Sequence, residues 1–132
     1  MKYLLDTHTL LWVRFSPNKL KKTQKEAIES PDEEKFISCI TAWEISLKYS
    51  LGKLDLGGHT PDEFIAGIHE LGIKIITPTP EQYATYYLLP RIDEHKDPFD
   101  RMIIWHALQS GLALISSDTH FPQYKPHGLE LV

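Results

Sequence analysis

The stretch of sequence that decides the fold is DPFDRMIIWHALQSGLALISSD, residues 97–118. Asp97 is a natural helix N-cap and Pro98 suits the first helical position, so an apolar helix is expected to begin here. The run 112–116 that follows is short and apolar, as is typical of a buried strand. A helix that leads into such a strand packs antiparallel to it, which predicts an α/β protein.

Outside this stretch, apolar runs of strand length alternate with longer amphipathic segments. The expected strands are 3–5, 36–40, 73–76, 112–116 and a last edge strand at 129–132. Besides the helix from Asp97, the expected helices cover about 8–15, 21–29, 41–52, 61–71 and 80–89. This order predicts a three-layer α/β sandwich, with a mainly parallel central sheet of four to five strands flanked by helices. No linker interrupts it, so residues 1–132 are expected to form a single domain.

The composition is that of an ordinary globular protein, with 42% hydrophobic and 24% charged residues among 132. No apolar stretch is long enough to span a bilayer, and an aspartate interrupts the N-terminus before a signal-peptide core can develop. The lone cysteine, Cys39, excludes an intrachain disulfide and is expected to be a small core residue. These features favour a cytoplasmic protein with no membrane partner.

Charge is distributed unevenly along the chain, whose formal net charge is −4. Residues 1–53 carry nine Lys and Arg against seven Asp and Glu, whereas residues 54–132 carry five against eleven. The overall acidity argues against a protein that coats nucleic acid non-specifically. Four lysines fall close together, at Lys19, Lys21, Lys22 and Lys25. They form either a solvated helix face or a rim that contacts phosphates around an acidic site.

Four acidic residues occupy equivalent places in this scheme. Asp6 directly follows the first strand, and Asp118 comes just after the strand 112–116. Glu44 completes a capping-box pattern, which puts it in the first turn of the helix after the second strand. Asp100 lies in the first turn of the helix that precedes the strand 112–116. All four carboxylates are therefore expected at the carboxyl edge of the sheet, where open α/β sheets bind their ligands.

Such a cluster needs protons or a cation. Two carboxylates about 4 Å apart repel by about 4 kcal/mol at an effective dielectric of roughly 20. Four of them either take up protons with raised pKa values or bind a metal ion. Oxygen ligands in a partly open site suit Mg²⁺, with Mn²⁺ as the alternative. A divalent cation there can acidify water and shield a phosphodiester, so phosphodiester hydrolysis is the natural chemistry.

Each acid taken alone also has a plainer explanation. Glu44, Asp97 and Asp100 stand where helix capping and the helix dipole favour acidic residues. Asp6 and Asp118 have no such routine role at the ends of apolar strands. The conjunction of four acids at one edge is what indicates a site.

Four segments of the chain carry a family resemblance. They are Leu4–Trp12 (LLDTHTLLW), Ser38–Lys48 with Trp43-Glu44-Ile45 inside it, His95–Arg101 (HKDPFDR), and Ser116–Asp118 followed by Phe121. In this order they resemble the PIN domain, and in particular the VapC toxins of bacterial and archaeal toxin–antitoxin pairs. The HKDPFDR stretch is quite specific to this family.

The resemblance implies a Mg²⁺-dependent endoribonuclease with the PIN-like three-layer fold. Its metal ligands and catalytic carboxylates would match Asp6, Glu44, Asp100 and Asp118. The implied partners are an RNA substrate, a second copy in a homodimer, and an antitoxin protein that covers the site.

Supporting roles around these ligands are expected for Thr7, Asp97, Arg101 and Ser116. Asp97 would act as a cap and supporting carboxylate, and the Ser116 hydroxyl would orient Asp118 or a water. Arg101 would contact phosphate or form an ion pair with a nearby acid.

Several neighbouring residues are less decisive. His95 directly precedes the acidic motif and is a further candidate. Trp12 and Trp43 are expected to be anchors of the core or of a dimer interface. Trp105-His106 replaces the smaller pair usual in the VapC toxins, which would alter the groove or the dimer contact.

Two other function classes compete with the nuclease. The first is a PIN-fold binding module that is catalytically weak and acts mainly through antitoxin complex formation and operon autoregulation. The intact set of four acids argues against it. The second is a phosphatase of the haloacid-dehalogenase kind, in which Asp6 would be the nucleophile. That chemistry needs a second aspartate two residues later, where His8 stands, and room for a cap domain.

Overall fold

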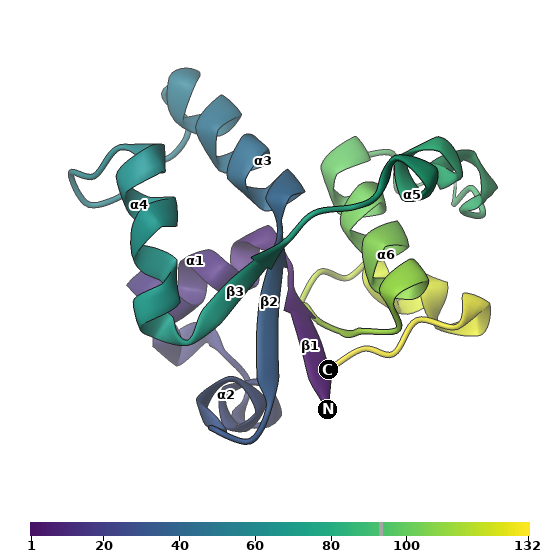
Figure 1. Cartoon of the computed structure of the whole chain (residues 1–132), viewed down its shortest axis with the longest axis horizontal. Coiled ribbons are helices and arrows are strands. Elements are labelled where there is room, and N and C mark those ends of the chain that lie inside the picture. Colours follow the sequence, from purple (N-terminus) through teal and green to yellow (C-terminus); the bar gives the residue numbers. More distant parts are fainter. Residues whose placement is uncertain (93) are drawn as a thin grey trace.

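Four short parallel strands form the centre of the molecule, in the order β3-β2-β1-β4 (Figure 1). The computed structural model describes residues 1–92 and 94–132. The strands are β1 (Lys2–Leu5), β2 (Glu34–Ser38), β3 (Ile73–Ile76) and β4 (Ala113–Ile115). Leu5 pairs with Ile37 on one side and with Ile115 on the other, so the carboxyl ends of β1, β2 and β4 are level.

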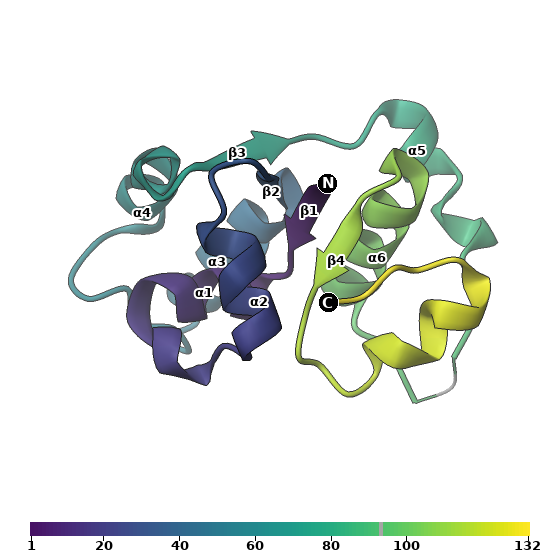
Figure 2. The same ribbon diagram turned by 90° about the horizontal axis from the view of Figure 1, so that it is seen from below.

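Helices cover both faces of this sheet (Figures 1 and 2). The α-helices are α1 (Thr7–Phe15), α2 (Lys22–Glu29), α3 (Cys39–Ser50), α4 (Pro61–Gly67), α5 (Pro80–Ala84) and α6 (Pro98–Ser110). Short 3₁₀ helices cover Pro17–Lys19, Ile68–Leu71, Tyr86–Leu88 and Phe121–His127. Helices α1 to α4 lie on one side of the sheet, and α5 and α6 lie on the other. The predicted three-layer α/β sandwich is confirmed, and its sheet is entirely parallel among the described residues.

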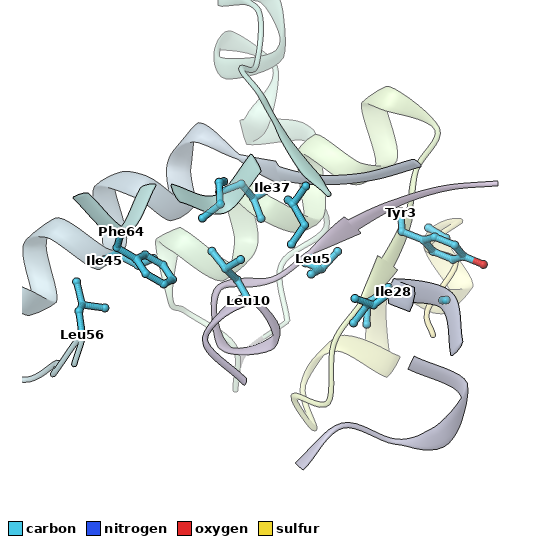
Figure 3. Close-up of a cluster of buried hydrophobic side chains, with 13 residues drawn as sticks. Tyr3, Leu5, Leu10, Ile28, Ile37, Ile45, Leu56 and Phe64 are labelled. Atoms are coloured by element: carbon cyan, nitrogen blue, oxygen red, sulfur yellow. The ribbon is translucent and has the colours of Figure 1, made fainter. Parts of the chain in front are cut away.

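Each side of the sheet has its own cluster of buried apolar side chains. Leu5 and Ile37 pack with Leu10 and Phe64 on the side of α1 and α4 (Figure 3). Leu4 packs in a second cluster that includes the apolar face of α6. Successive residues of β1 therefore enter opposite cores, as expected for a parallel sheet that is buried on both faces.

The decisive helix begins where the sequence predicts. The Asp97 carboxylate accepts from the backbone N–H groups of Phe99 and Asp100, at 2.9 and 3.1 Å, and Pro98 occupies the first position of α6. Gly111 ends α6 with a φ of 65°, a left-handed conformation that glycine adopts without strain. The chain then turns directly into β4, which fixes the antiparallel packing of helix and strand.

Helix α3 begins earlier than the sequence predicts. Ser38 is its N-cap and accepts from the N–H of Ile40 at 3.2 Å, so the helix starts at Cys39 rather than at Thr41. The prediction that Glu44 lies in the first turn is therefore wrong, because Glu44 lies in the second turn. Cys39 is only half-buried, with its Sγ 3.5 Å from the hydroxyl of Tyr83, and is not the core residue expected.

Two further elements differ from the prediction. Residues 129–132 do not form a strand, because only Leu131 makes a bridge, to Leu114 of the three-residue strand β4. The helix expected over 80–89 ends at Ala84 and continues as the 3₁₀ turn Tyr86–Leu88. Among the described residues, no helix combines the length and the apolar character needed to cross a membrane.

Candidate functional site

The site lies at the carboxyl edge of the sheet and begins with Asp6. Asp6 follows β1 directly and caps α1, and only 3% of it is exposed. One carboxylate oxygen accepts from the N–H of Thr9 at 2.8 Å, and the other accepts from the Ser116 hydroxyl at 2.5 Å. Burial raises the pKa of Asp6 even though both hydrogen bonds favour the ionised form. The carboxylate is thus fixed in place and poorly hydrated.

Glu44 reaches the same edge from α3. It is 2% exposed, and its Oε1 accepts from the Thr7 hydroxyl at 2.6 Å. Its Oε2 forms an ion pair with the ammonium of Lys48, one helical turn further on. Burial alone would lower the pKa of Lys48, but its hydrogen bond to Glu44 and the nearby carboxylates raise it. Lys48 is a site residue that the analysis of the sequence missed, although a Glu–Lys pair at i, i+4 is a recognisable signal.

Asp100 shows that the acids share one electrostatic environment. Its pKa is raised to about 7, first by burial and then by the charges of Asp97, Glu44, Asp118 and Asp6. Asp97 caps the helix that carries Asp100, whereas Glu44, Asp118 and Asp6 come from other parts of the fold. All four acids that the sequence singles out therefore lie near enough for their charges to act on one another.

Ser116 links two of the acids. Its hydroxyl donates to Asp6 and accepts from the backbone N–H of Asp118 at 3.1 Å. The Asp118 carboxylate in turn accepts from the backbone of His120 at 2.8 Å and lies 3.1 Å from Nδ1 of the same residue. Ser116 therefore contacts the backbone of Asp118, whereas the side chain that it orients is Asp6.

The donor set fits a hard divalent cation. The four acids offer only oxygen, and their mutual repulsion, visible in the raised pKa of Asp100, is what a dication would relieve. In the described part of the chain, however, no three Asp, Glu, His or Cys side chains converge closely enough to hold one ion as they stand. Lys48 pairs with Oε2 of Glu44, so a cation that binds this oxygen would compete with the lysine.

His95 and Arg101 form a rigid support behind Asp100. His95 is 4% exposed, with Nε2 3.4 Å from the Asp100 carboxylate and Nδ1 2.8 Å from the Tyr124 hydroxyl. Arg101 donates to the hydroxyls of Tyr124 and Tyr86, at 2.9 and 3.0 Å, and to two backbone carbonyls. The ion pair between Arg101 and an acid is not found among the described residues, because the hydrogen bonds of Arg101 go to tyrosine and carbonyl oxygens.

The tryptophans and His106 lie elsewhere than expected. Trp43 is 63% exposed and contacts the edge of Phe99, so it is not a core residue. Trp105 is buried and donates to the backbone carbonyl of Gln82 at 2.9 Å. His106 is buried with its Nδ1 2.9 Å from the Ser38 hydroxyl. The pair Trp105-His106 therefore joins α6 to its neighbours inside the fold.

His106 is expected to make the fold sensitive to acid. Burial lowers its pKa to about 4, against 6.5 for an exposed histidine. Below pH 6.5 the unfolded chain takes up a proton that the folded chain refuses, so stability falls as the pH drops toward 4. Between pH 6.5 and about 5 we expect the stability of wild type relative to His106→Gln, measured by urea unfolding, to fall by about 2 kcal/mol. His106→Gln keeps a polar partner for Ser38 and should remove that slope; an unchanged slope would contradict this assignment.

The lysine cluster lies on Pro17–Lys19 and on the N-cap and first turns of α2. The side chains of Lys19, Lys21, Lys22 and Lys25 are exposed, and Lys22 pairs with Glu26 at 3.9 Å. Gln24 lies among them but is fully buried, and it went unnoticed in the sequence. Its amide donates to the carbonyls of Ser116 and Val132, at 3.3 and 3.1 Å. Gln24 thus ties α2 to the end of β4.

Gln24→Ala is expected to destabilise the fold by about 2 kcal/mol, because it leaves the buried Ser116 carbonyl without its donor. Urea unfolding measures the loss. Gln123 is exposed, so Gln123→Ala serves as the matched control and should change stability by less than about 0.5 kcal/mol. Equal effects of the two substitutions would show that the buried amide contributes nothing specific.

Comparisons with known proteins agree with this architecture. The PIN domain family model matches residues 3–125. The structure of VapBC-1 from nontypeable Haemophilus influenzae matches with a TM-score of 0.66 and 20% identity, over 100% of this chain and 97% of that chain. DNA-bound VapBC from Salmonella typhimurium matches with a TM-score of 0.65 and 20% identity, over the same shares of the two chains.

A third solved structure is VapBC2 from Rickettsia felis bound to a DNA fragment from their promoter. It matches with a TM-score of 0.61 and 18% identity, over 100% of this chain and 98% of that chain. At these identities the likeness concerns the fold. No curated protein matches the sequence. Because the family model spans nearly the whole chain, the chain belongs to the PIN domain family.

Proposed function

We propose that the protein is a metal-dependent endoribonuclease that acts as the toxin of a toxin–antitoxin pair. The observation that carries the proposal is the raised pKa of Asp100, to about 7, by burial and by the charges of Asp97, Glu44, Asp118 and Asp6. A divalent cation would relieve this repulsion, which supports a metal site at this edge of the sheet. Membership of the PIN domain family, whose members are generally nucleases, supports the same reading.

Asp6, Asp100 and Asp118, with Glu44, are the residues that would hold Mg²⁺. When bound, a divalent cation supplies positive charge for the phosphodiester and lowers the pKa of water, as metal-dependent hydrolysis requires. Ser116 and Thr9 hold the Asp6 carboxylate in one orientation, so this ligand needs little reorganisation. We propose RNA rather than DNA as the substrate because the sequence resembles the VapC toxins, and that resemblance implies an endoribonuclease.

The polar side chains around the acids control where protons and hydrogen bonds lie in the site. Asp100 has a pKa near neutrality, so in the metal-free protein its carboxyl can hold a proton at physiological pH. His95 faces that carboxyl through Nε2, and Tyr124 anchors the opposite nitrogen of the ring. Thr7 and Lys48 hold Glu44, and release of Lys48 would free one Glu44 oxygen for the cation.

An antitoxin and a second copy of the chain are the proposed protein partners. The VapBC structures to which this chain is similar are complexes, two of them bound to DNA. Exposed apolar side chains recur at a spacing of four residues along α3 and its C-cap, at Trp43, Leu47 and Leu51. This stripe supports a protein interface, and it is the observation that favours the second candidate function, a module that acts through complex formation alone.

Purified protein, freed of any partner, tests the proposal against a mixture of structured and single-stranded RNA. We expect endonucleolytic cleavage with Mg²⁺ and none with EDTA. Calorimetry on the same sample should show binding of Mg²⁺ or Mn²⁺. Absence of both cleavage and metal binding would leave the binding module as the better description.

A further inference from the structure

A hollow in the surface lies beside the acidic edge. It has a volume of about 500 Å³, and the residues that line it include Tyr86, Tyr87, Arg91, His95, Lys96 and Arg101. His95 lies in its wall and also faces Asp100, with 3.4 Å between Nε2 and the carboxylate. The hollow, called here the Tyr87 pocket, is therefore separated from the acidic edge by one side chain.

The inner wall of the Tyr87 pocket is rigid and carries a fixed positive charge. Arg101 is buried there, held by hydrogen bonds to the hydroxyls of Tyr86 and Tyr124 and to backbone carbonyls. The Tyr86 ring lies 5.5 Å from the Arg101 guanidinium carbon. Because hydrogen bonds already hold the Arg101 guanidinium in place, its charge can attract an anion into the pocket without a change in its conformation.

The outer wall consists of side chains that are free to meet a ligand. Tyr87 is 77% exposed, and Arg91 and Lys96 are exposed beside it. An aromatic ring next to cations is the arrangement that proteins use for single-stranded nucleic acid, with the base stacked on the ring and the phosphate near the cations. The volume suits a ligand of nucleotide size, within the usual range of roughly 300–1,000 Å³.

We propose that the Tyr87 pocket binds one nucleotide of a single-stranded RNA, next to the bond that the carboxylates cleave. The base stacks on Tyr87, and a phosphate lies between Arg91 and Lys96. This inference rests on the proposed nuclease function and extends it, because an acidic edge repels the RNA backbone and needs cations nearby to retain the strand. The lysines of α2 are the rival place for that contact.

The test measures binding separately from cleavage. Fluorescence anisotropy with a labelled eight-nucleotide RNA in EDTA compares wild type with Tyr87→Ala and with Arg91→Ala/Lys96→Ala. We expect Tyr87→Ala to weaken binding about fivefold or more. The double substitution should weaken it about tenfold at low salt and reduce the slope of log K against log salt by about 0.7, as expected for one phosphate contact.

Matched controls use residues away from the pocket. Tyr49→Ala removes another exposed tyrosine, and Lys21→Ala/Lys25→Ala removes two charges from the rival lysine cluster. Both controls should bind the RNA within about twofold of wild type, since neither lies near the pocket. If the lysine pair weakens binding as much as Arg91 and Lys96 do, while Tyr87→Ala changes nothing, the proposal is overturned.

Abasic nucleotides identify the contact itself. Wild type should lose about fivefold in affinity when the base that meets Tyr87 is removed, and Tyr87→Ala should lose nothing further at that position. A mononucleotide that binds as tightly as the RNA strand would overturn the proposal, because the pocket would then be a site for free nucleotides.

Failure of this inference is distinguishable from failure of the proposed function. If wild type cleaves RNA and the Tyr87 and Arg91/Lys96 variants do so with unchanged kcat/KM and affinity, the pocket is wrong and the nuclease stands. If no form cleaves RNA but the variants lose binding as expected, the pocket stands and the nuclease is wrong. If wild type neither binds nor cleaves the RNA, both are overturned.

Discussion

Asp6→Asn is expected to lower kcat/KM for RNA cleavage by about 100-fold or more, because it removes charge from a proposed metal ligand. The fold should survive. Asparagine has the shape of aspartate, its carbonyl can still accept from Thr9, and its amide can donate to the Ser116 hydroxyl. Burial already raises the pKa of Asp6, so loss of the charge does not cost stability.

Initial cleavage rates over a range of Mg²⁺ concentrations measure this effect, with calorimetric metal binding as the second readout. Asp32→Asn is the charge-matched control. Asp32 is exposed and lies in the turn before β2, whereas the site lies where the strands end. Wild-type rates in the Asp32 variant and a large loss in the Asp6 variant are expected. Undiminished cleavage by Asp6→Asn would contradict the assignment of Asp6 as a ligand.

The positions of the acids were predictable because they depend on topology. In a parallel sheet every strand ends at the same edge, so Asp6 after β1 and Asp118 after β4 had to approach each other once the strands were identified. A helix that packs antiparallel to the strands brings its first turn to that edge, which places Asp100. Glu44 lies in the second turn of α3 rather than in the predicted first turn. The predicted position of its carboxylate was little affected, because a shift of one turn along α3 keeps this side chain near the edge.

The partners of the acids were not predictable in the same way. Lys48 meets Glu44 through a local i, i+4 contact, which the sequence displays. His95, Tyr124 and Arg101 instead meet through three segments whose relative positions depend on how the chain packs after β4. An arginine near several acids in the sequence suggests an ion pair. In the structure Arg101 is buried and donates instead to tyrosine hydroxyls and backbone carbonyls. Sequence patterns identify charges, and packing decides which of them meet.

The exposed and buried aromatic residues illustrate the same limit. Trp43 and Trp105 have similar surroundings in the sequence. Each lies in an apolar helical segment and is followed by a polar residue, Glu44 or His106. Trp105 is buried because α5 packs over it and accepts its indole N–H, whereas Trp43 faces outward on α3. Only the arrangement of the neighbouring helices separates a core residue from a candidate contact surface.

Asp100→Asn is expected to stabilise the metal-free protein by about 3 kcal/mol at pH 8. The pKa of Asp100 is about 7 in the folded protein and 3.8 in the reference state of an exposed carboxyl. The folded chain therefore binds this proton more tightly, so ionisation costs stability progressively as the pH rises from 3.8 to 7, and the full cost persists above pH 7. Asparagine is neutral throughout and can still accept a hydrogen bond from His95.

Urea unfolding in EDTA at pH 8 and at about pH 5 tests this prediction, and the gain should shrink by roughly half at the lower pH. Asp62→Asn is the control of opposite sign, since a hydrogen bond with Thr60 lowers the pKa of that exposed carboxylate and its removal should not stabilise. Added Mg²⁺ should stabilise wild type, because the cation offsets the same repulsion, and should stabilise Asp100→Asn much less. A variant with no gain in EDTA, or one that Mg²⁺ stabilises as strongly as wild type, would show that Asp100 neither bears the repulsion of the cluster nor binds the cation that relieves it.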